Sequence, residues 1–143
     1  MKYYIDGISD EQWEKNVAAY RREFDRLAHR LPPDVLNVLE NGLHDSDVLS
    51  ISVYNRAASE GRAKIVQVKI SNDRYYGNFV HEDVLELTFT YKIRGCSWYG
   101  YSCEYAYGEI LLEGDVWVHN FTCQDSMEVI IKCKSIGWED ISR

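Results

Sequence analysis

Apolar residues recur near the start of the chain at the spacing of one helix face. They lie alternately four and three residues apart, at Trp13, Val17, Tyr20, Phe24, Leu27 and Leu31. This stripe predicts an amphipathic helix. Ser9, with Gln12 three positions later, forms a capping box at its start, and charged residues occupy the opposite face. Before it, residues 3–5 are predicted to form a short edge strand.

The motif Leu31-Pro32-Pro33 predicts the end of this helix, because a residue before proline avoids the helical conformation. Pro33 suits the first turn of a second, short helix. Asn41-Gly42 is a typical C-terminal stop for that helix. Residues 1–42 are therefore predicted to form a helical hairpin.

The pattern changes at Leu43, after which apolar and polar residues alternate as in β-strands. The clearest strand is expected at residues 85–93, where every second residue is apolar. Short connections favour antiparallel pairing, and residues 43–143 are predicted to hold about six or seven strands. Helices followed by strands predict one α+β domain, with the hairpin packed on a curved, mostly antiparallel sheet.

Composition limits the class of protein. The chain has 143 residues, of which 45% are hydrophobic and 27% charged, as expected for one globular domain. No apolar run approaches the roughly 20 residues needed to cross a bilayer, and the first residues lack a signal-peptide core, so a cytoplasmic location is expected. A net charge of −7 argues against nucleic-acid binding and favours a basic protein partner.

Common catalytic and cofactor fingerprints are absent from the sequence. It contains no phosphate-binding glycine loop, no dinucleotide fingerprint, no His-Glu-x-x-His and no nucleophile elbow. The four cysteines, at positions 96, 103, 123 and 133, fit no common zinc-site spacing and are expected to be buried thiols. These observations favour a protein that is not an enzyme and needs no cofactor.

One junction could still carry chemistry. His44, Asp45 and Asp47 stand close together in the sequence where the helices give way to strands. Two carboxylates beside an imidazole can bind a divalent metal, so a metal-dependent hydrolase is an alternative function. The other interpretation is that both aspartates fix the local turn while His44 packs against the helical hairpin.

Two further histidines have expected environments. His81, followed by Glu82 and Asp83, is predicted to lie in an exposed acidic loop before a strand. His119 lies within a predicted strand and is expected to be a hydrogen-bonded structural residue. If His44, His81 and His119 met in space, a metal site would become plausible.

Residues 95–131 form an acidic, aromatic stretch with no Lys or Arg, six acidic residues and seven aromatic residues. On a regular strand the residues of one face would be Tyr105, Tyr107, Glu109 and Glu113. The opposite, core-facing set would be Ala106, Gly108, Ile110 and Leu112. The first face is predicted to be exposed and to bind a basic partner, since tyrosines supply contact area and carboxylates steer the encounter. The alternative is a large aromatic core with ordinary solvated acids around it.

A cavity between the helical hairpin and the sheet is a third possibility. The candidate lining residues are Trp13, Tyr20 and Trp98. Such a cavity would make the protein a small-ligand-binding domain.

Several motifs mark a family resemblance. The helix with Trp13, Tyr20 and Phe24, the Leu31-Pro32-Pro33 stop and the Leu43-His44-Asp45 junction resemble an uncharacterised bacterial domain family. The later strands Tyr107-Gly108-Glu109-Ile110 and Met127-Glu128-Val129-Ile130 are similar too. The junction is also similar to one in some immunity proteins of bacterial polymorphic-toxin systems. That second resemblance implies a non-catalytic inhibitor that binds a basic protein toxin.

Overall fold

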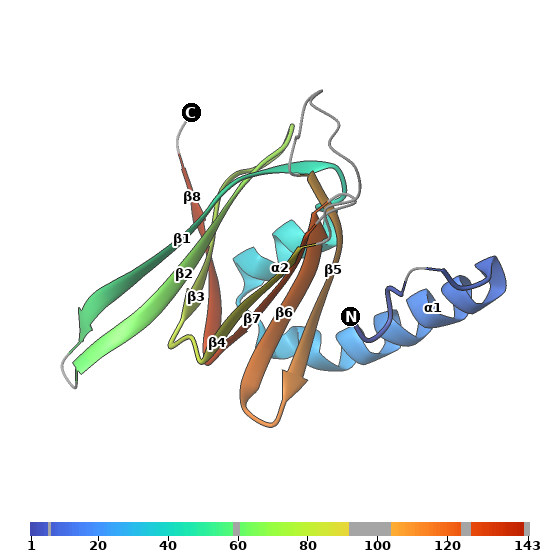
Figure 1. Ribbon diagram of the computed structural model, residues 1–143, viewed down its shortest axis with the longest axis horizontal. Coiled ribbons are helices and arrows are strands. Elements are labelled where there is room, and N and C mark those ends of the chain that lie inside the picture. Colours follow the sequence, from blue (N-terminus) through green and yellow to red (C-terminus); the bar gives the residue numbers. More distant parts are fainter. Residues whose placement is uncertain (6, 59–60, 92–103, 124–126, 142–143) are drawn as a thin grey trace.

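The chain folds into two α-helices and one strongly curved antiparallel sheet (Figure 1). A computed structural model describes residues 1–5, 7–58, 61–91, 104–123 and 127–141. The helical elements are α1 (Asp10–Leu27), the 3-10 helix η1 (Ala28–Arg30) and α2 (Pro33–Glu40). The strands are β1 (Ser46–Ala58), β2 (Gly61–Ser71), β3 (Tyr76–Glu82), β4 (Glu86–Tyr91), β5 (Glu104–Glu113), β6 (Val116–Cys123), β7 (Met127–Cys133) and β8 (Ser135–Asp140). The predicted α+β fold is confirmed.

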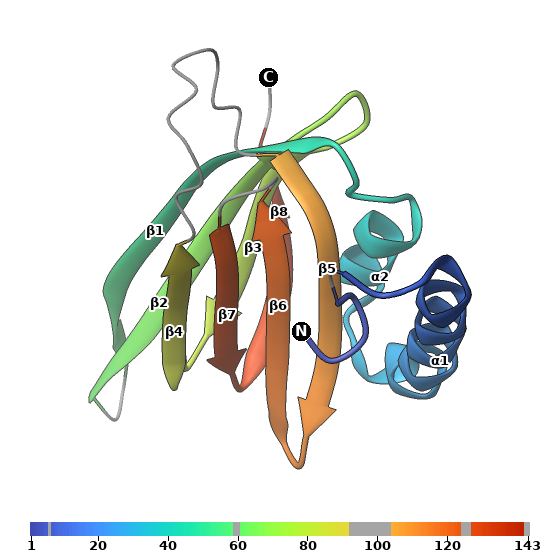
Figure 2. The ribbon, with the colours of Figure 1, turned by 45° about the vertical axis from the view of Figure 1, so that its right-hand side comes forward.

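The sheet is divided near its middle. Its order is β4-β7-β6-β5-β1-β2-β3-β8, and every pair is antiparallel. Neighbouring strands pair along most of their length, except that β1 and β5 share only Ser46↔Tyr105 and Asp47↔Glu104. Beyond those two pairs the strands diverge (Figure 2). Most of β5 therefore behaves as a free edge, which a fold must cover.

Helix α1 covers that edge without being buried. Its start has the expected cap, in which the Gln12 N–H donates to Ser9 Oγ at 3.2 Å. The Ile110 N–H of β5 donates to the Tyr20 hydroxyl oxygen at 2.9 Å, which satisfies one edge donor. Yet none of the 18 residues of α1 is buried. The apolar stripe of α1 is only partly covered by the rest of the described chain.

Helix α2 instead joins the core. Pro33 occupies its first turn, and Val35 and Val38 are 0% and 1% exposed within the main apolar cluster. The centre of that cluster holds Phe79 of β3 and Phe121 of β6, strands from opposite halves of the sheet. Curvature therefore brings the two halves together around one core, beside α2.

Three details differ from the sequence predictions. Residues 3–5 form no strand. The stretch before Asp83, expected to be a loop, contains β3, so the described residues hold eight strands. Leu85, just before β4, and Phe89 within β4 face solvent at 62% and 47% exposed, although the alternation predicts that both face the core. Within the described chain no helix combines the length and apolar character needed to span a bilayer.

Candidate binding groove

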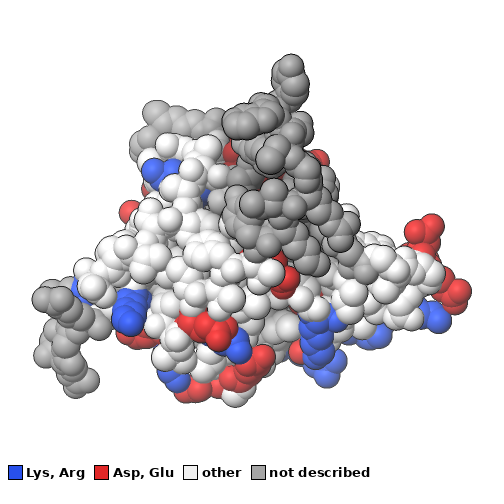
Figure 3. Space-filling view, in the orientation of Figure 1, with Lys and Arg blue, Asp and Glu red and all other residues white. Residues whose placement is uncertain are grey.

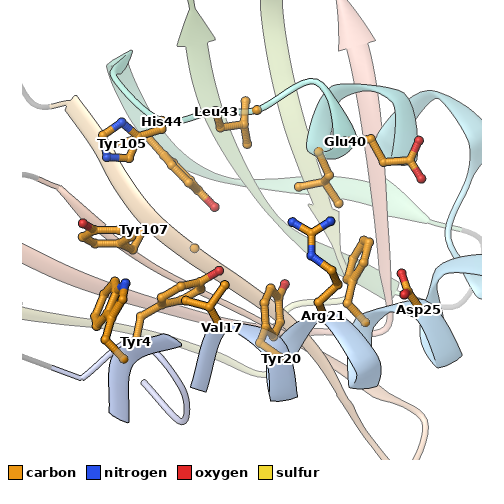
Figure 4. A pocket seen from close by; sticks show the side chains of 15 residues that line it. Tyr4, Val17, Tyr20, Arg21, Asp25, Glu40, Leu43, His44, Tyr105 and Tyr107 are labelled. Atoms are coloured by element: carbon orange, nitrogen blue, oxygen red, sulfur yellow. The ribbon is translucent and has the colours of Figure 1, made fainter. Parts of the chain in front are cut away.

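A groove of about 720 Å³ opens between α1, the α2–β1 junction and β5 (Figure 4). It lies along β5 where that strand stops pairing with β1. Six aromatic side chains line it: Tyr4, Trp13, Tyr20, Phe24, Tyr105 and Tyr107. Its size falls in the range of functional pockets, about 300–1,000 Å³.

Four of these rings, Tyr4, Trp13, Tyr20 and Tyr107, touch one another and are called here the ring cluster. Tyr4 stacks on Tyr107 with centroids 5.4 Å apart, and Trp13 meets Tyr107 edge-on at 5.0 Å. Tyr4 also contacts Trp13 and Tyr20, each at 5.5 Å. Tyr107 remains 39% exposed, so the cluster presents apolar surface to an incoming group.

Charged side chains surround the rings. Figure 4 shows Arg21 extending from α1 into the groove, with Asp25 and Glu40 at the same end. No carboxylate of the described ranges lies within ion-pair distance of the Arg21 guanidinium. At the other end, His44 Nδ1 lies 3.1 Å from an Asp45 carboxylate oxygen.

Glu109 of β5 lies behind the ring cluster and holds residues 2–4, called here the strap. Its carboxylate accepts the backbone N–H of Lys2 at 3.0 Å, of Tyr3 at 2.6 Å and of Tyr4 at 2.7 Å. These three bonds compensate the burial of a side chain that is 1% exposed. Burial and then the nearby Glu109 charge raise the pKa of Tyr4 above its ordinary value.

The predicted exposed face of β5 is wrong for two of its four residues. Tyr105 is 4% exposed and Glu109 is 1% exposed. The β5–β6 register shifts between Tyr105 and Tyr107, and this bulge turns the Tyr105 ring to the side of Phe121, with centroids 5.1 Å apart. Glu109 does share a face with Tyr107, but the strap covers it.

The other two residues of that face are exposed, as predicted. Tyr107 lines the groove, and Glu113, near the far end of β5, forms a weak ion pair with Lys132 at 3.7 Å. Trp13 and Tyr20 line the cavity predicted between helices and sheet. Trp98, the third residue predicted there, lies outside the described residues.

Tyr105 ends a buried chain of polar groups. Its hydroxyl lies 3.3 Å from His119 Nε2, His119 Nδ1 lies 2.8 Å from His81 Nε2, and His81 Nδ1 lies 2.9 Å from the Val66 carbonyl oxygen. A carbonyl only accepts, so His81 Nδ1 carries a proton and its Nε2 accepts from His119. His119 Nε2 then accepts from Tyr105.

Both imidazoles are neutral in this chain. Each is 0% exposed. Burial lowers the pKa of His81 to about 4, against a smaller opposing effect of its bond to Val66. Burial, and then His81, lower the pKa of His119 well below its ordinary value. The prediction of an exposed loop at His81 is wrong, because that residue lies in β3, and the hydrogen-bonded environment predicted for His119 is confirmed.

The metal site that the sequence offers as an alternative at the junction finds no support in the described residues. His44 and Asp45 are exposed, and His44 lies away from the buried pair His81 and His119. Among the residues that the structure describes, no three His, Cys, Asp or Glu side chains are placed to hold a metal ion. Asp45 adopts φ 65° and its N–H donates to the Tyr105 carbonyl, while Asp47 begins the β1 ladder. The junction therefore fixes the chain path beside the groove.

Comparison with known proteins adds no family. No family model, curated protein or solved structure matches this chain. The resemblance to a bacterial domain family and to immunity proteins therefore stays a prediction.

The composition of the hydrophobic stripe on α1 was a signal for the groove. Three of the six residues of α1 that line the groove are aromatic, and Arg21 stands among them. A stripe that only packs against a core more often consists of aliphatic residues. The role of Glu109 had no such signal, because it depends on residues more than 100 positions earlier.

Proposed function

We propose that this protein is a non-catalytic binding protein whose groove receives a segment of a partner protein. The observation that supports this most is the composition of the groove wall: Tyr4, Trp13, Tyr20, Tyr107 and Arg21. Trp, Tyr and Arg are the residues that dominate binding energy in protein interfaces. Here Trp13, Tyr20 and Arg21 stand on α1, a helix with no buried residue.

The shape of the groove favours a protein segment over a small molecule. Small-ligand sites enclose most of their ligand, whereas this groove is open to solvent and Tyr107 in its wall is 39% exposed. A small-ligand-binding domain remains the second candidate, supported by the volume of about 720 Å³.

The charge of the chain favours a basic partner. The net charge is −7. Figure 3 shows blue and red side chains interspersed on one face, so on that face the negative charge is distributed and not gathered in one patch. Such charge steers a basic protein toward the molecule, while the rings supply contact energy. An immunity-type inhibitor of a basic toxin, acting in the cytoplasm, is the specific form of the proposal.

The environment of the histidines supports a role without catalysis. The two imidazoles that meet are wholly buried, and each of their ring nitrogens has a partner. A general acid or base must instead reach a proton of the substrate. The described cysteines, Cys123 and Cys133, are buried free thiols, as is usual for proteins of reducing compartments.

A site-specific photo-crosslink tests the proposal. Benzoylphenylalanine replaces Trp13 in the full chain, and the matched control places it at Lys15, an exposed position on the same helix. Irradiation in a lysate of the native host should give a discrete protein adduct from position 13 and none from position 15. The captured protein is then purified, and Tyr107→Ala should weaken its binding at least about tenfold. Identical adducts at both positions, or no adduct at 13, would overturn the proposal.

A further inference from the structure

The strap is bound to the rest of the molecule as a peptide ligand would be. Its three successive N–H groups converge on one carboxylate, Glu109. Successive amides in a bent segment form an anion-binding nest, which depends on the backbone and not on the side chains. Any peptide that adopts the same bend could offer the same three donors.

Side chains of α1 contact the remaining groups of the strap. Asn16 Nδ2 donates to the Tyr3 carbonyl at 2.9 Å. Glu23 accepts from Lys2 Nζ at 3.2 Å and also from the Tyr3 hydroxyl. Each contact matches one chemical feature of the strap: a basic side chain, a phenol and a backbone carbonyl.

The third position of the strap enters the groove. The Tyr4 ring completes the ring cluster, with Trp13, Tyr20 and Tyr107 within 5.5 Å of its centroid. Asn120, the cross-strand partner of Glu109, is 8% exposed, and its Oδ1 has no hydrogen-bond partner in the described part of the chain. The Asn120 side-chain oxygen is therefore a buried acceptor on the strand next to Glu109.

We propose that Glu109, Asn16, Glu23 and the rings of Trp13, Tyr20 and Tyr107 form a peptide-binding site for a partner segment of the type basic–aromatic–aromatic, and that the strap is its resident occupant. The proposal rests on the proposed function and specifies the chemistry of the partner segment. A basic first position agrees with the negative charge of the chain and with the carboxylate of Glu23. Partner binding then exchanges the strap for a chemically similar segment.

The test uses the full chain and a free peptide, acetyl-Lys-Tyr-Tyr-Ile-amide. In the Tyr4→Ala variant the strap loses its ring and competes less well for the site. The free peptide should then bind with a dissociation constant of about 1 mM or tighter, since a segment on a short tether acts at an effective concentration in the millimolar range. Binding to the wild-type chain should be at least tenfold weaker, because the intact strap competes. Tryptophan fluorescence and amide chemical shifts report the binding.

Two matched controls identify the site. Adding Glu109→Gln to Tyr4→Ala should abolish peptide binding, whereas adding Glu113→Gln, an exposed position of the same strand, should not. The peptide acetyl-Glu-Tyr-Tyr-Ile-amide should bind at least tenfold more weakly, because its first side chain meets Glu23. Equal binding to the two glutamine variants, or no binding to Tyr4→Ala while its circular dichroism is native, would overturn the proposal.

A measurement on the wild-type chain covers the case in which Tyr4→Ala fails to fold. A displaceable strap requires the amides of Tyr3 and Tyr4 to exchange hydrogen faster than that of Leu111 within the β5–β6 ladder. Equal or slower exchange would overturn the proposal. Its failure differs from that of the proposed function, since a position-13 crosslink would persist without peptide binding.

Discussion

Nε2 of His81 lies 2.8 Å from Nδ1 of His119 in the core, although the two residues belong to strands in opposite halves of the sheet. The Val66 carbonyl at one end fixes the direction of every proton in the chain. Both rings are 0% exposed, so a further proton would place a charge among buried groups with no carboxylate against it. Burial therefore favours the neutral form of both rings in the pair that joins the two halves.

The stability of the fold is expected to fall as the solution becomes acidic. The unfolded chain binds protons at both histidines below about pH 6.5, whereas the folded pKa values are lower, about 4 for His81. Stabilisation is thus complete above pH 6.5 and is lost as the pH falls toward 4. Between pH 7.5 and 5 the loss from His81 is about 2 kcal/mol, and His119 adds to it in the same direction. Urea denaturation at the two pH values measures it.

Proton NMR provides the control for that assignment. The chain has four histidines, and the other two, His29 and His44, are exposed. The ring resonances of the buried pair, His81 and His119, should stay constant between pH 7.5 and 5. Movement of either set over this range in the folded protein would contradict the neutral buried pair.

Gly108→Ala is expected to displace the Tyr105 ring. A β-carbon at position 108 would collide with the Tyr105 hydroxyl and ring. Overpacking of this kind costs about 1–3 kcal/mol, and Tyr105→Phe should restore part of the loss in the double variant. Gly137→Ala is the matched control, because its β-carbon would find its nearest neighbour at 4.0 Å. Equal costs for both glycines, from urea denaturation, would refute the close packing.

Glu109→Gln is expected to lower the free energy of unfolding by about 1–3 kcal/mol, because an amide replaces a carboxylate that accepts three N–H bonds. Glu113→Gln makes the same substitution four residues later, at an exposed ion pair of 3.7 Å, and should cost less than about 0.5 kcal/mol. Chemical denaturation at pH 7 compares them. A difference near zero would show that the strap contributes nothing to stability.

Tyr107→Ala and Tyr105→Ala should separate binding from folding. Tyr107 is 39% exposed in the groove wall, so its removal should cost about 1 kcal/mol and weaken partner binding. Tyr105 is 4% exposed in the core, and its removal should cost about 3–5 kcal/mol. Thermal and urea denaturation measure both. The reverse order of costs would contradict the bulge in β5.

The sequence predicted what depends on local rules. Ser9 caps α1, Pro33 begins α2, and alternation after Leu43 marks the strands, because capping, proline geometry and period-two burial act over a few residues. The bulge between Tyr105 and Tyr107 was not predictable, since a one-residue shift leaves the alternation unchanged while reversing the face.

The candidate site was predicted only in part. Trp13 and Tyr20 were placed correctly in a cavity between helices and sheet. The polar segment before Asp83 is typical of a loop, but it forms β3. The contact between His81 and His119 was therefore not predictable. The contacts of Glu109 with residues 2–4 connect parts of the chain 105–107 positions apart, and no local pattern encodes such a pairing.

That separation has a consequence for synthesis. Residues 2–4 leave the ribosome before the carboxylate that receives them, which is translated more than 100 residues later. At roughly 10 residues per second, the nascent chain displays Lys2, Tyr3 and Tyr4 without their acceptor for on the order of 10 s. A chain stalled before β5 would leave this tripeptide without its docking place, in reach of chaperones and of neighbouring nascent chains.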